Sequence, residues 1–222
     1  MARFSWADIY KVWATHDWAK VIWTDECAFN VGGAPGRIWV TRRAEEEFAE
    51  SCLLPKFKKR ESIIVWGCIV GRRKGPLIIW DKGAWGKTIN AKGYQTHIVP
   101  HLDRFWNTES VRTNDYVYIQ HDNTSSHHAR TTVAELQERG LYNYLKSWPA
   151  TSPDLNPIEA VWRLMKTRIG KLVPRPQNNS DMITAIQDQW SSITEFELGQ
   201  ILDTMVDRVG AVLSASGGHT KY

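Results

Sequence analysis

The sequence of 222 residues lacks a long hydrophobic run and has few cysteines. Its longest apolar stretch, SIIVWGCIVG at residues 62–71, is far shorter than the roughly 20 apolar residues that cross a bilayer. The first residues, MARFSWADIYKVWATHDW, lack the apolar centre of a signal peptide. Three cysteines without CxxC spacing argue against a disulfide framework and a zinc site, and indicate a reducing compartment. The sequence therefore predicts a soluble intracellular protein.

The chain also lacks a strong excess of either charge, an internal repeat and a low-complexity tract. Its formal net charge of +4 at pH 7 is only mildly basic, so contacts with nucleic acid must come from local clusters. Charged residues make up 23% and hydrophobic residues 42%, which argues against general disorder and suffices for one well-filled domain. The 12 tryptophans are expected to serve as core and packing residues.

Apolar periodicity predicts an α/β fold, with a mixed sheet flanked by helices and a C-terminal helical extension. Strand patterns occur at residues 21–26, 36–42, 62–71, 75–80, 116–123 and 141–148. Helical spacing occurs at residues 3–19, 88–106 and 126–139, from Ile158 onward, and in two stretches after residue 181. Strands that first pair and then alternate with helices are typical of a mixed sheet.

Three segments are expected along the chain. Residues 1–20 are predicted to form a linker helix, residues 21–173 the α/β core, and residues 174–222 further helices of the same domain. Thr194 and Glu197 have the S/T-x-x-E spacing of a capping box at the start of the last helix. The linker helix is expected to place its apolar side chains near one side, namely Phe4, Ile9, Trp13 and Trp18.

Two aspartates lie where predicted strands run out. Asp25 ends the apolar run VIWTD, and Asp122 ends YVYIQHD. If these strands are adjacent and parallel, both aspartates emerge at the carboxyl edge of the sheet, where open α/β sheets build their sites. Glu26 and Asn123, the next residues, would point the other way. For each aspartate alone, a turn at the strand end is the alternative interpretation.

A third acid, Glu159, follows the proline-rich approach SWPATSPDLNP. With Asn156 as N-cap and Pro157 first in the helix, Glu159 falls where a glutamate completes a capping box, which is the alternative role. The prolines fix the direction from which the helix starts, and such rigidity matters for a metal ligand. Three converging carboxylates repel each other unless a divalent cation joins them, and oxygen donors suit Mg²⁺ or Mn²⁺. Two such ions can clamp the attacking and leaving oxygens of a phosphodiester displacement.

The blocks VIWTDE, SIIVWGCIVG, YIQHDNTSSHHAR, SWPATSPDLNPIEAVW and GGHTKY resemble, in this order, the mariner-type DDE transposases, in the branch whose third acid is glutamate. The resemblance runs from about Trp13 to Tyr222. It implies a ribonuclease-H-like fold and a two-ion Mg²⁺ or Mn²⁺ site that cuts DNA at transposon ends and rejoins it to target DNA. It also implies catalytic and metal-binding roles for three acids, with Asp25 touching both ions and Asp122 and Glu159 one each.

The resemblance extends to residues beside these acids. Asn123 and Asn156 match polar positions, for which we expect supporting duties. His127 or His128 matches a histidine that often follows the second acid, and we expect a surface or helix-start role for either. The 36 residues of the stretch 123–158 are slightly more than is usual in this branch.

Clusters of positive charge are the expected contacts to a phosphate backbone. The sequence KFKKR at residues 56–60 could also serve as a nuclear-import signal, and a nuclear location is predicted. The implied partners are DNA, at the transposon ends and in the target, and a second copy of the chain in a homodimer. The predicted DNA-binding residues are Arg163, Lys166, Arg168 and Lys171 in the Glu159 helix, and Arg72, Arg73 and Lys74 between two strands.

Two alternatives stay open on the sequence alone. A plain nuclease of the same fold would cut DNA without strand transfer. A host-adopted or degenerate DNA-binding or scaffold remnant would keep the acids without catalysis. Family members carry N-terminal helix-turn-helix units, and this sequence starts just before the expected core, so we expect a trimmed chain, a degraded copy or a host-adopted remnant.

Overall fold

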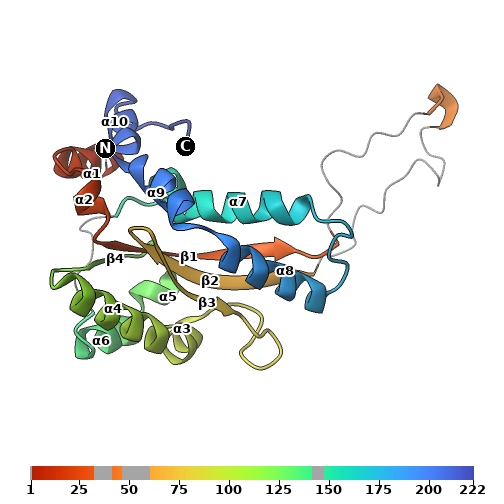
Figure 1. Ribbon diagram of the computed structural model, residues 1–222, viewed down its shortest axis with the longest axis horizontal. Coiled ribbons are helices and arrows are strands. Elements are labelled where there is room, and N and C mark those ends of the chain that lie inside the picture. The colour runs from red at the N-terminus through yellow and green to blue at the C-terminus, as the bar shows by residue number, and fades with distance from the viewer. Residues whose placement is uncertain (1, 33–41, 47–60, 142–147) are drawn as a thin grey trace.

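The structure, a computed structural model, describes residues 2–32, 42–46, 61–141 and 148–222. Within these residues the sheet has four strands in the order β3-β2-β1-β4, with helices on both faces (Figure 1). The predicted mixed sheet flanked by helices is therefore confirmed. Its strands are β1 (Val21–Asn30), β2 (Ser62–Val70), β3 (Arg73–Ile79) and β4 (Tyr118–Gln120).

Strand β1 lies between an antiparallel and a parallel neighbour. It pairs antiparallel with β2, where Asp25 stands opposite Gly67, and parallel with β4, where Trp23 stands opposite Gln120. Two residues beyond this pair, the chain reaches Asp25 in β1 and Asp122 just after the end of β4. The prediction that the two strands are adjacent and parallel is confirmed, and it brings the aspartates to the same level of the sheet.

Two strand boundaries differ from the predictions. Strand β1 continues past Asp25 to Asn30, because Cys27 and Phe29 are buried while Ala28 and Asn30 are exposed, the alternation of a half-buried strand. The prediction that this strand runs out at Asp25 is wrong. Strand β4 is shorter than expected and ends at Gln120. The predicted strands at 36–42 and 141–148 fall almost entirely outside the described residues.

Helices form two layers around the sheet (Figure 1). One layer contains α7 (Ile158–Gly170), α8 (Asn179–Ser192), α9 (Glu195–Asp203) and α10 (Met205–Ser214). The other contains α3 (Ala91–His97), α4 (Val99–Thr113), α5 (Ser125–His128) and α6 (Arg130–Glu138). Short 3-10 turns occur at η1 (Ala44–Glu46) and η3 (Pro153–Leu155). No helix in the described part of the chain is long and apolar enough to cross a membrane.

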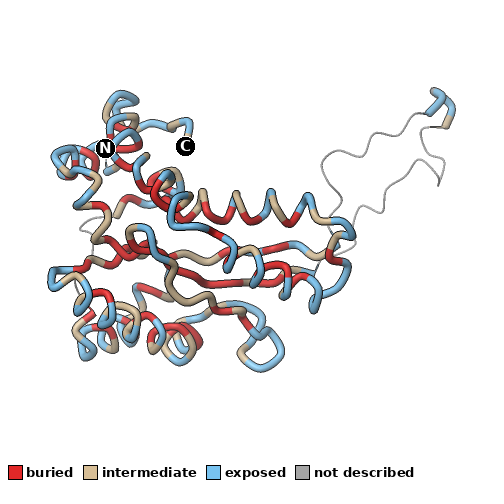
Figure 2. Tube along the Cα trace, viewed as in Figure 1, coloured by how far each residue is buried: buried red, intermediate tan, exposed pale blue. Residues whose placement is uncertain are grey.

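Each face of the sheet has its own hydrophobic core, and Figure 2 shows buried residues along the strands and on the inner sides of both helix layers. Because strand side chains alternate, Trp23 joins the core under α7, while its neighbour Ile22 joins the core under α4. The face that carries Trp23 also carries Asp25, so α7 covers the side on which this acid lies.

The predicted N-terminal helix is two helices, α1 (Ala2–Tyr10) and α2 (Thr15–Trp18). Helix α1 packs through Trp6 and Tyr10, which are buried, whereas Phe4 and Ile9 are 41% and 55% exposed. The predicted apolar side is therefore wrong for Phe4 and Ile9, because the break after Tyr10 lets α1 dock in a different rotation from α2.

Six aromatic rings form one cluster between the N-terminal helices and the sheet. Neighbouring ring centroids lie 4.7 to 6.2 Å apart, and tilted and edge contacts of this kind add to the stabilisation from burial. The cluster ties α1 and α2 to β1 and to the chain before α7, so these tryptophans pack as predicted. The aromatic cluster consists of Trp6, Tyr10, Trp13, Trp18, Trp23 and Trp148.

Three further predicted helices are interrupted. The 88–106 pattern divides into α3 and α4 at Ile98, and the 126–139 pattern divides into α5 and α6 at Ala129, which has an extended ψ of 134°. The last predicted helix divides at Thr204 into α9 and α10. The predicted capping box at its start is confirmed by reciprocal bonds between Thr194 and Glu197, at 3.0 and 3.2 Å.

Candidate active site

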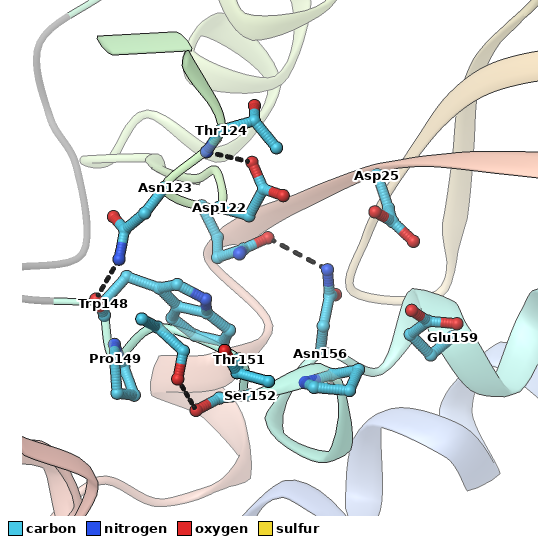
Figure 3. A pocket seen from close by; sticks show the side chains of 13 residues that line it. Asp25, Asp122, Asn123, Thr124, Trp148, Pro149, Thr151, Ser152, Asn156 and Glu159 are labelled. Atoms are coloured by element: carbon cyan, nitrogen blue, oxygen red, sulfur yellow. Dashed lines mark hydrogen bonds between the residues drawn. The ribbon is translucent and has the colours of Figure 1, made fainter. Parts of the chain in front are cut away.

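A pocket of about 370 Å³ lies where β1, the end of β4 and the start of α7 meet (Figure 3). All three predicted acids, Asp25, Asp122 and Glu159, line it. The rest of the wall consists of residues 148–153 and the polar side chains of Gln120, Asn123, Thr124 and Asn156. Side chains that lie 97 and 37 positions apart along the chain therefore meet in one cavity, as the parallel pairing of β1 and β4 leads us to expect.

Asp25 faces Glu159 across this pocket (Figure 3). Burial raises the pKa of Asp25 to about 8, and the negative charges of Glu159 and Glu26 act in the same direction. The indole Nε1 of Trp162 donates a hydrogen bond to Asp25 Oδ2 at 3.0 Å, which favours the ionised form but does not outweigh burial. The site thus brings together two carboxyl groups, Asp25 and Glu159, and the charge of Glu159 disfavours ionisation of Asp25.

Gly67 makes the close approach of Trp162 possible. It stands opposite Asp25 on β2, and a Cβ at this position would lie 2.8 Å from the Trp162 ring and 3.3 Å from Trp190. The lack of a side chain therefore lets the indole lie against the sheet and reach Asp25. The sequence analysis gave no role to the N–H group of Trp162; its position three residues after Glu159 in the predicted helix was the available signal.

Replacing Gly67 by alanine is expected to destabilise the protein by about 1–3 kcal/mol, because the added methyl overpacks the contact with Trp162. Urea unfolding of the variant and wild type measures this difference. Gly210→Ala in α10 is the matched control, since a Cβ there meets nothing within 4 Å and is expected to be neutral or stabilising by up to about 1 kcal/mol. Equal midpoints for Gly67→Ala and wild type would contradict the close packing.

Asp122 is held on the other side of the pocket by a histidine and a turn. His127 Nδ1 lies 2.8 Å from Asp122 Oδ1, and the backbone N–H of Thr124 donates to the same oxygen at 3.0 Å. Burial disfavours the charged carboxylate, but these hydrogen bonds outweigh it and lower the pKa of Asp122 to about 2. Asp122 is therefore ionised at neutral pH, unlike Asp25.

His127 is buried, with 6% of its surface exposed. Its Nε2 lies 3.3 Å from Glu26 Oε1, so the ring bridges the second acid and the residue after the first. Burial disfavours the imidazolium, but the hydrogen bond to Asp122 and the nearby negative charge of Glu26 raise the pKa of His127 to about 10. The predicted surface role is therefore wrong for His127, although it does lie in the short helix α5. Glu26 does not line the pocket, as predicted, but Asn123 does line it, so the prediction that Asn123 points the other way is wrong, because the strand ends at Gln120 and strand alternation does not extend to Asn123. His128 is exposed.

The start of α7 does not use Glu159 as a cap. The Asn156 side chain accepts the N–H of Ile158 at 3.3 Å, while the N–H of Asn156 donates to the carbonyl of Pro153 at 3.0 Å. A capping box would require that same N–H to donate to the Glu159 carboxylate. The capping role considered for Glu159 is therefore wrong, and its carboxylate faces the pocket (Figure 3).

Two predicted supporting residues connect the elements that carry the acids. Asn156 is buried, and its Nδ2 donates to the Thr24 carbonyl at 3.1 Å and to Gln120 Oε1 at 3.2 Å. Thr24 Oγ1 in turn donates to the Gln120 carbonyl at 2.8 Å. Asn123 Nδ2 donates to the carbonyl of Trp148 at 2.9 Å (Figure 3). These bonds join β1, β4, the pocket wall and the start of α7.

Comparison with known proteins identifies this arrangement. The sequence profile of the DDE superfamily endonucleases matches residues 20–183. The chain belongs to this family. Along its whole length it is 31% identical to the Tc1 transposase of Caenorhabditis elegans, over 227 aligned residues that cover 77% of that relative. This DDE domain is therefore a transposase catalytic domain of Tc1/mariner type.

Solved structures give the DDE domain its fold. The Mos1 transposase catalytic domain with raltegravir and Mg superposes with a TM-score of 0.74 at 14% identity, covering 99% of this chain and 96% of that one. The Mos1 mariner paired-end complex with Mn gives a TM-score of 0.74 at 16% identity, covering 99% and 63%. The ribonuclease-H-like fold implied by the sequence resemblance is confirmed.

The predicted DNA-binding residues of the DDE domain occupy different settings. Arg163 and Lys166 line a surface hollow together with Glu159, and Lys171 is exposed at the far end of α7. Arg168 forms an ion pair with Glu197 of the capping box. Three of these four side chains are thus directed to solvent along the helix that carries the third acid.

The basic residues around the β2–β3 turn have partners within the DDE domain. Arg73 pairs with the fully buried Glu109 at 3.0 Å, and Arg72 packs against Gly199. The Lys74 ammonium donates to three carbonyls at the end of α8, at 2.6 to 2.9 Å, where cations favour the negative end of the helix dipole. These side chains hold helices to the sheet, and none of them lines the pocket of the three acids.

The pocket of the DDE domain fits a divalent cation by its chemistry. Three carboxylates offer the hard oxygen donors that Mg²⁺ and Mn²⁺ prefer, and burial and the charge of Glu159 both disfavour the ionised form of Asp25 without a counter-ion. Among the described residues, no three His, Cys, Asp or Glu side chains lie close enough together to enclose an ion. Asp122 lines the same pocket and is held by His127.

Proposed function

We propose that this transposase domain uses Asp25, Asp122 and Glu159 to hold two Mg²⁺ or Mn²⁺ ions, to cut DNA at transposon ends and to join the cut ends to target DNA. The observation that carries the proposal is the single pocket that all three acids line, next to the parallel β1–β4 pair. The solved Mos1 relatives with Mg and with Mn support the choice of ion.

In this proposal each acid has a distinct duty. Asp25, in the middle and facing Glu159, would contact both ions, and Asp122 would contact one of them as a carboxylate that His127 keeps charged. Trp162 orients Asp25 through its N–H, and Asn156 fixes the start of the Glu159 helix. When bound, the ions supply Lewis-acid stabilisation of charge on phosphate oxygens and activation of the attacking water or 3′-hydroxyl.

DNA is the proposed partner, and α7 supplies its first contacts. Arg163 and Lys166 share a hollow with Glu159, so a strand whose phosphate lies at the acids would pass these two cations. Lys171 would extend this contact along the helix. The Mos1 paired-end complex with the left transposon end supports transposon ends as the bound DNA. A second copy of the chain, in a homodimer, is part of the same proposal. A nuclear location belongs to the same proposal, although residues 56–60 lie outside the described ranges.

Thermal unfolding with increasing Mn²⁺ tests the shared site. Protein freed of metal with EDTA is expected to gain stability by mass action, about 2.7 kcal/mol at a Mn²⁺ concentration 100 times the Kd. Asp25→Asn, Asp122→Asn and Glu159→Gln should each reduce this gain. Asp188→Asn, an exposed acid of α8, is the matched control and should keep it. A wild-type midpoint that does not respond to Mn²⁺ would reject the proposal.

A further inference from the structure

We propose that Asp154 is a positioning residue for Glu159, and that both ends of the described chain hold it in place. Arg3 of α1, Arg208 of α10 and Thr220 converge on Asp154, five positions before Glu159. We call these four residues, Arg3, Asp154, Arg208 and Thr220, the Asp154 anchor. The inference rests on the proposed role of Glu159 as a metal ligand, and it explains why the approach to α7 is so firmly fixed.

The Asp154 carboxylate is bound in a bidentate ion pair. The Arg3 guanidinium donates to Oδ1 at 2.7 Å and to Oδ2 at 2.6 Å, and the two side chains are only 16% and 13% exposed. Exposed ion pairs contribute little, but a shielded pair with two parallel hydrogen bonds is both stronger and more specific in its geometry. Arg3 also donates to Ser152 Oγ at 2.8 Å, so it binds the proline-rich segment before α7 at two positions, Ser152 and Asp154.

Residues 217–220 close the anchor from the other side. Arg3 donates to the carbonyls of Gly217 and Gly218, each at 3.1 Å, and Thr220 Oγ1 donates to Asp154 Oδ2 at 2.7 Å. In Figure 1 the N and C marks accordingly lie near each other beside α1 and α10. Segments more than 200 positions apart in the sequence thus share one carboxylate.

The backbone of Asp154 is fixed as well as its side chain. Arg208 is buried, and its guanidinium donates to the Asp154 carbonyl at 2.5 Å and to Thr204 Oγ1 at 2.8 Å. The ring of Tyr222 covers the Arg208 guanidinium, 5.0 Å from its centroid, as in a cation–π contact. Asp154 therefore has little freedom to translate or to turn.

The link from Asp154 to Glu159 is short and stiff. Asp154 lies in η3, the fully buried Leu155 follows, and the carbonyl of Pro153 accepts the Asn156 N–H at the base of α7. Pro157 then restricts the backbone at the point where the helix begins. Asp154 and Glu159 also line one pocket of about 260 Å³.

Asp154→Asn tests the anchor, because it keeps the side-chain size and removes the charge that Arg3 binds. We expect faster amide hydrogen exchange over residues 151–159 in metal-free protein, and an increase of about 10-fold in the Kd for Mn²⁺, the usual effect of losing a residue that orients a metal ligand. Thr220→Val should change both quantities in the same direction by less. For Arg3→Lys, the increases in exchange rate and in Kd should lie between those of Thr220→Val and Asp154→Asn, since lysine keeps the positive charge but cannot form two parallel hydrogen bonds.

Glu109→Gln is the matched control for stability. It removes another ion-paired carboxylate, bound by Arg73 and Arg112 in the opposite helix layer, and should lower the unfolding midpoint without changing the Kd for Mn²⁺. In a Glu159→Gln background, Asp154→Asn should cause no further loss of Mn²⁺ affinity, because the two changes act through one ligand.

Two results would overturn the inference. One is unchanged amide exchange over residues 151–159 in Asp154→Asn, which needs no metal to observe. The other is an equal loss of Mn²⁺ affinity with and without Glu159, which would mean that Asp154 does not act through that residue. A wild-type protein that binds no Mn²⁺ while Asp154→Asn still accelerates exchange would reject the proposed metal site and leave the ordering role of the anchor supported.

Discussion

Nicking of supercoiled plasmid DNA in Mn²⁺ is expected to fall by about 10³-fold or more when Asp25, Asp122 or Glu159 is replaced by its amide. All three carboxylates line one pocket, and residues that act as one unit lose function together. Combining two of the substitutions should therefore cost little more than either alone. Purified wild type and variants, compared by the rate of relaxed-circle formation, give this measurement.

Asp188→Asn is again the control for the nicking assay and should keep the wild-type rate. A variant of the triad that nicks at more than a tenth of that rate would show that its acid is dispensable. The same reactions, run with a labelled DNA end and a second plasmid, also test joining. A labelled end covalently attached to the second plasmid is expected of a transposase domain, whereas a plain nuclease of this fold would leave hydrolysed ends alone.

The free energy of unfolding of the protein, kept free of metal with EDTA, is expected to fall as pH rises from about 4 to about 8. The pKa of Asp25 is about 8 in the folded state and about 3.8 when unfolded, because burial and Glu159 disfavour its charge. Between these values the folded protein keeps a proton that the unfolded chain has lost, so each increase in pH favours unfolding. The expected slope is on the order of 1 kcal/mol per pH unit.

Asp25→Asn isolates this contribution and should leave a flatter profile between pH 4 and 6.5. Above that range His127 acts in the same direction: its pKa is raised to about 10, so its stabilisation is complete below its usual value of 6.5 and is lost as pH rises towards 10. Asp122, with a pKa lowered to about 2, loses its stabilisation only below pH 4.

Urea unfolding in EDTA, from pH 4 to pH 9, checks the slopes. Parallel profiles for variant and wild type would contradict a buried, protonated Asp25.

The sequence predicted where the three acids meet better than it predicted their surroundings. Strand alternation and parallel pairing suffice to place Asp25 beside Asp122, because both rules depend on the backbone alone. The prolines before Glu159 similarly predicted a helix start with a fixed direction. The role of His127 was not predictable in this way, since its ring reaches Asp122 across a turn and Glu26 from another strand.

Helix boundaries and surface charges were the least predictable features. Ile9 has the right spacing for a buried face, yet α1 docks through Trp6, because tertiary packing decided which side is covered. Lys74 sits in a basic run that suggested DNA, but its ammonium meets the end of α8, a helix more than 100 positions away in the sequence. Such contacts depend on how helices stack on the sheet, which local sequence patterns do not contain.

The aromatic cluster gives the domain a built-in optical signal. Trp148 lines the pocket of the acids, and its ring lies 5.2 Å from Trp6 and 6.2 Å from Trp23. Near-ultraviolet circular dichroism depends on how closely packed indoles are oriented to one another. A change in the pocket wall that turns the Trp148 ring would alter its angle to these neighbours, so the near-ultraviolet spectrum of unlabelled protein would report it.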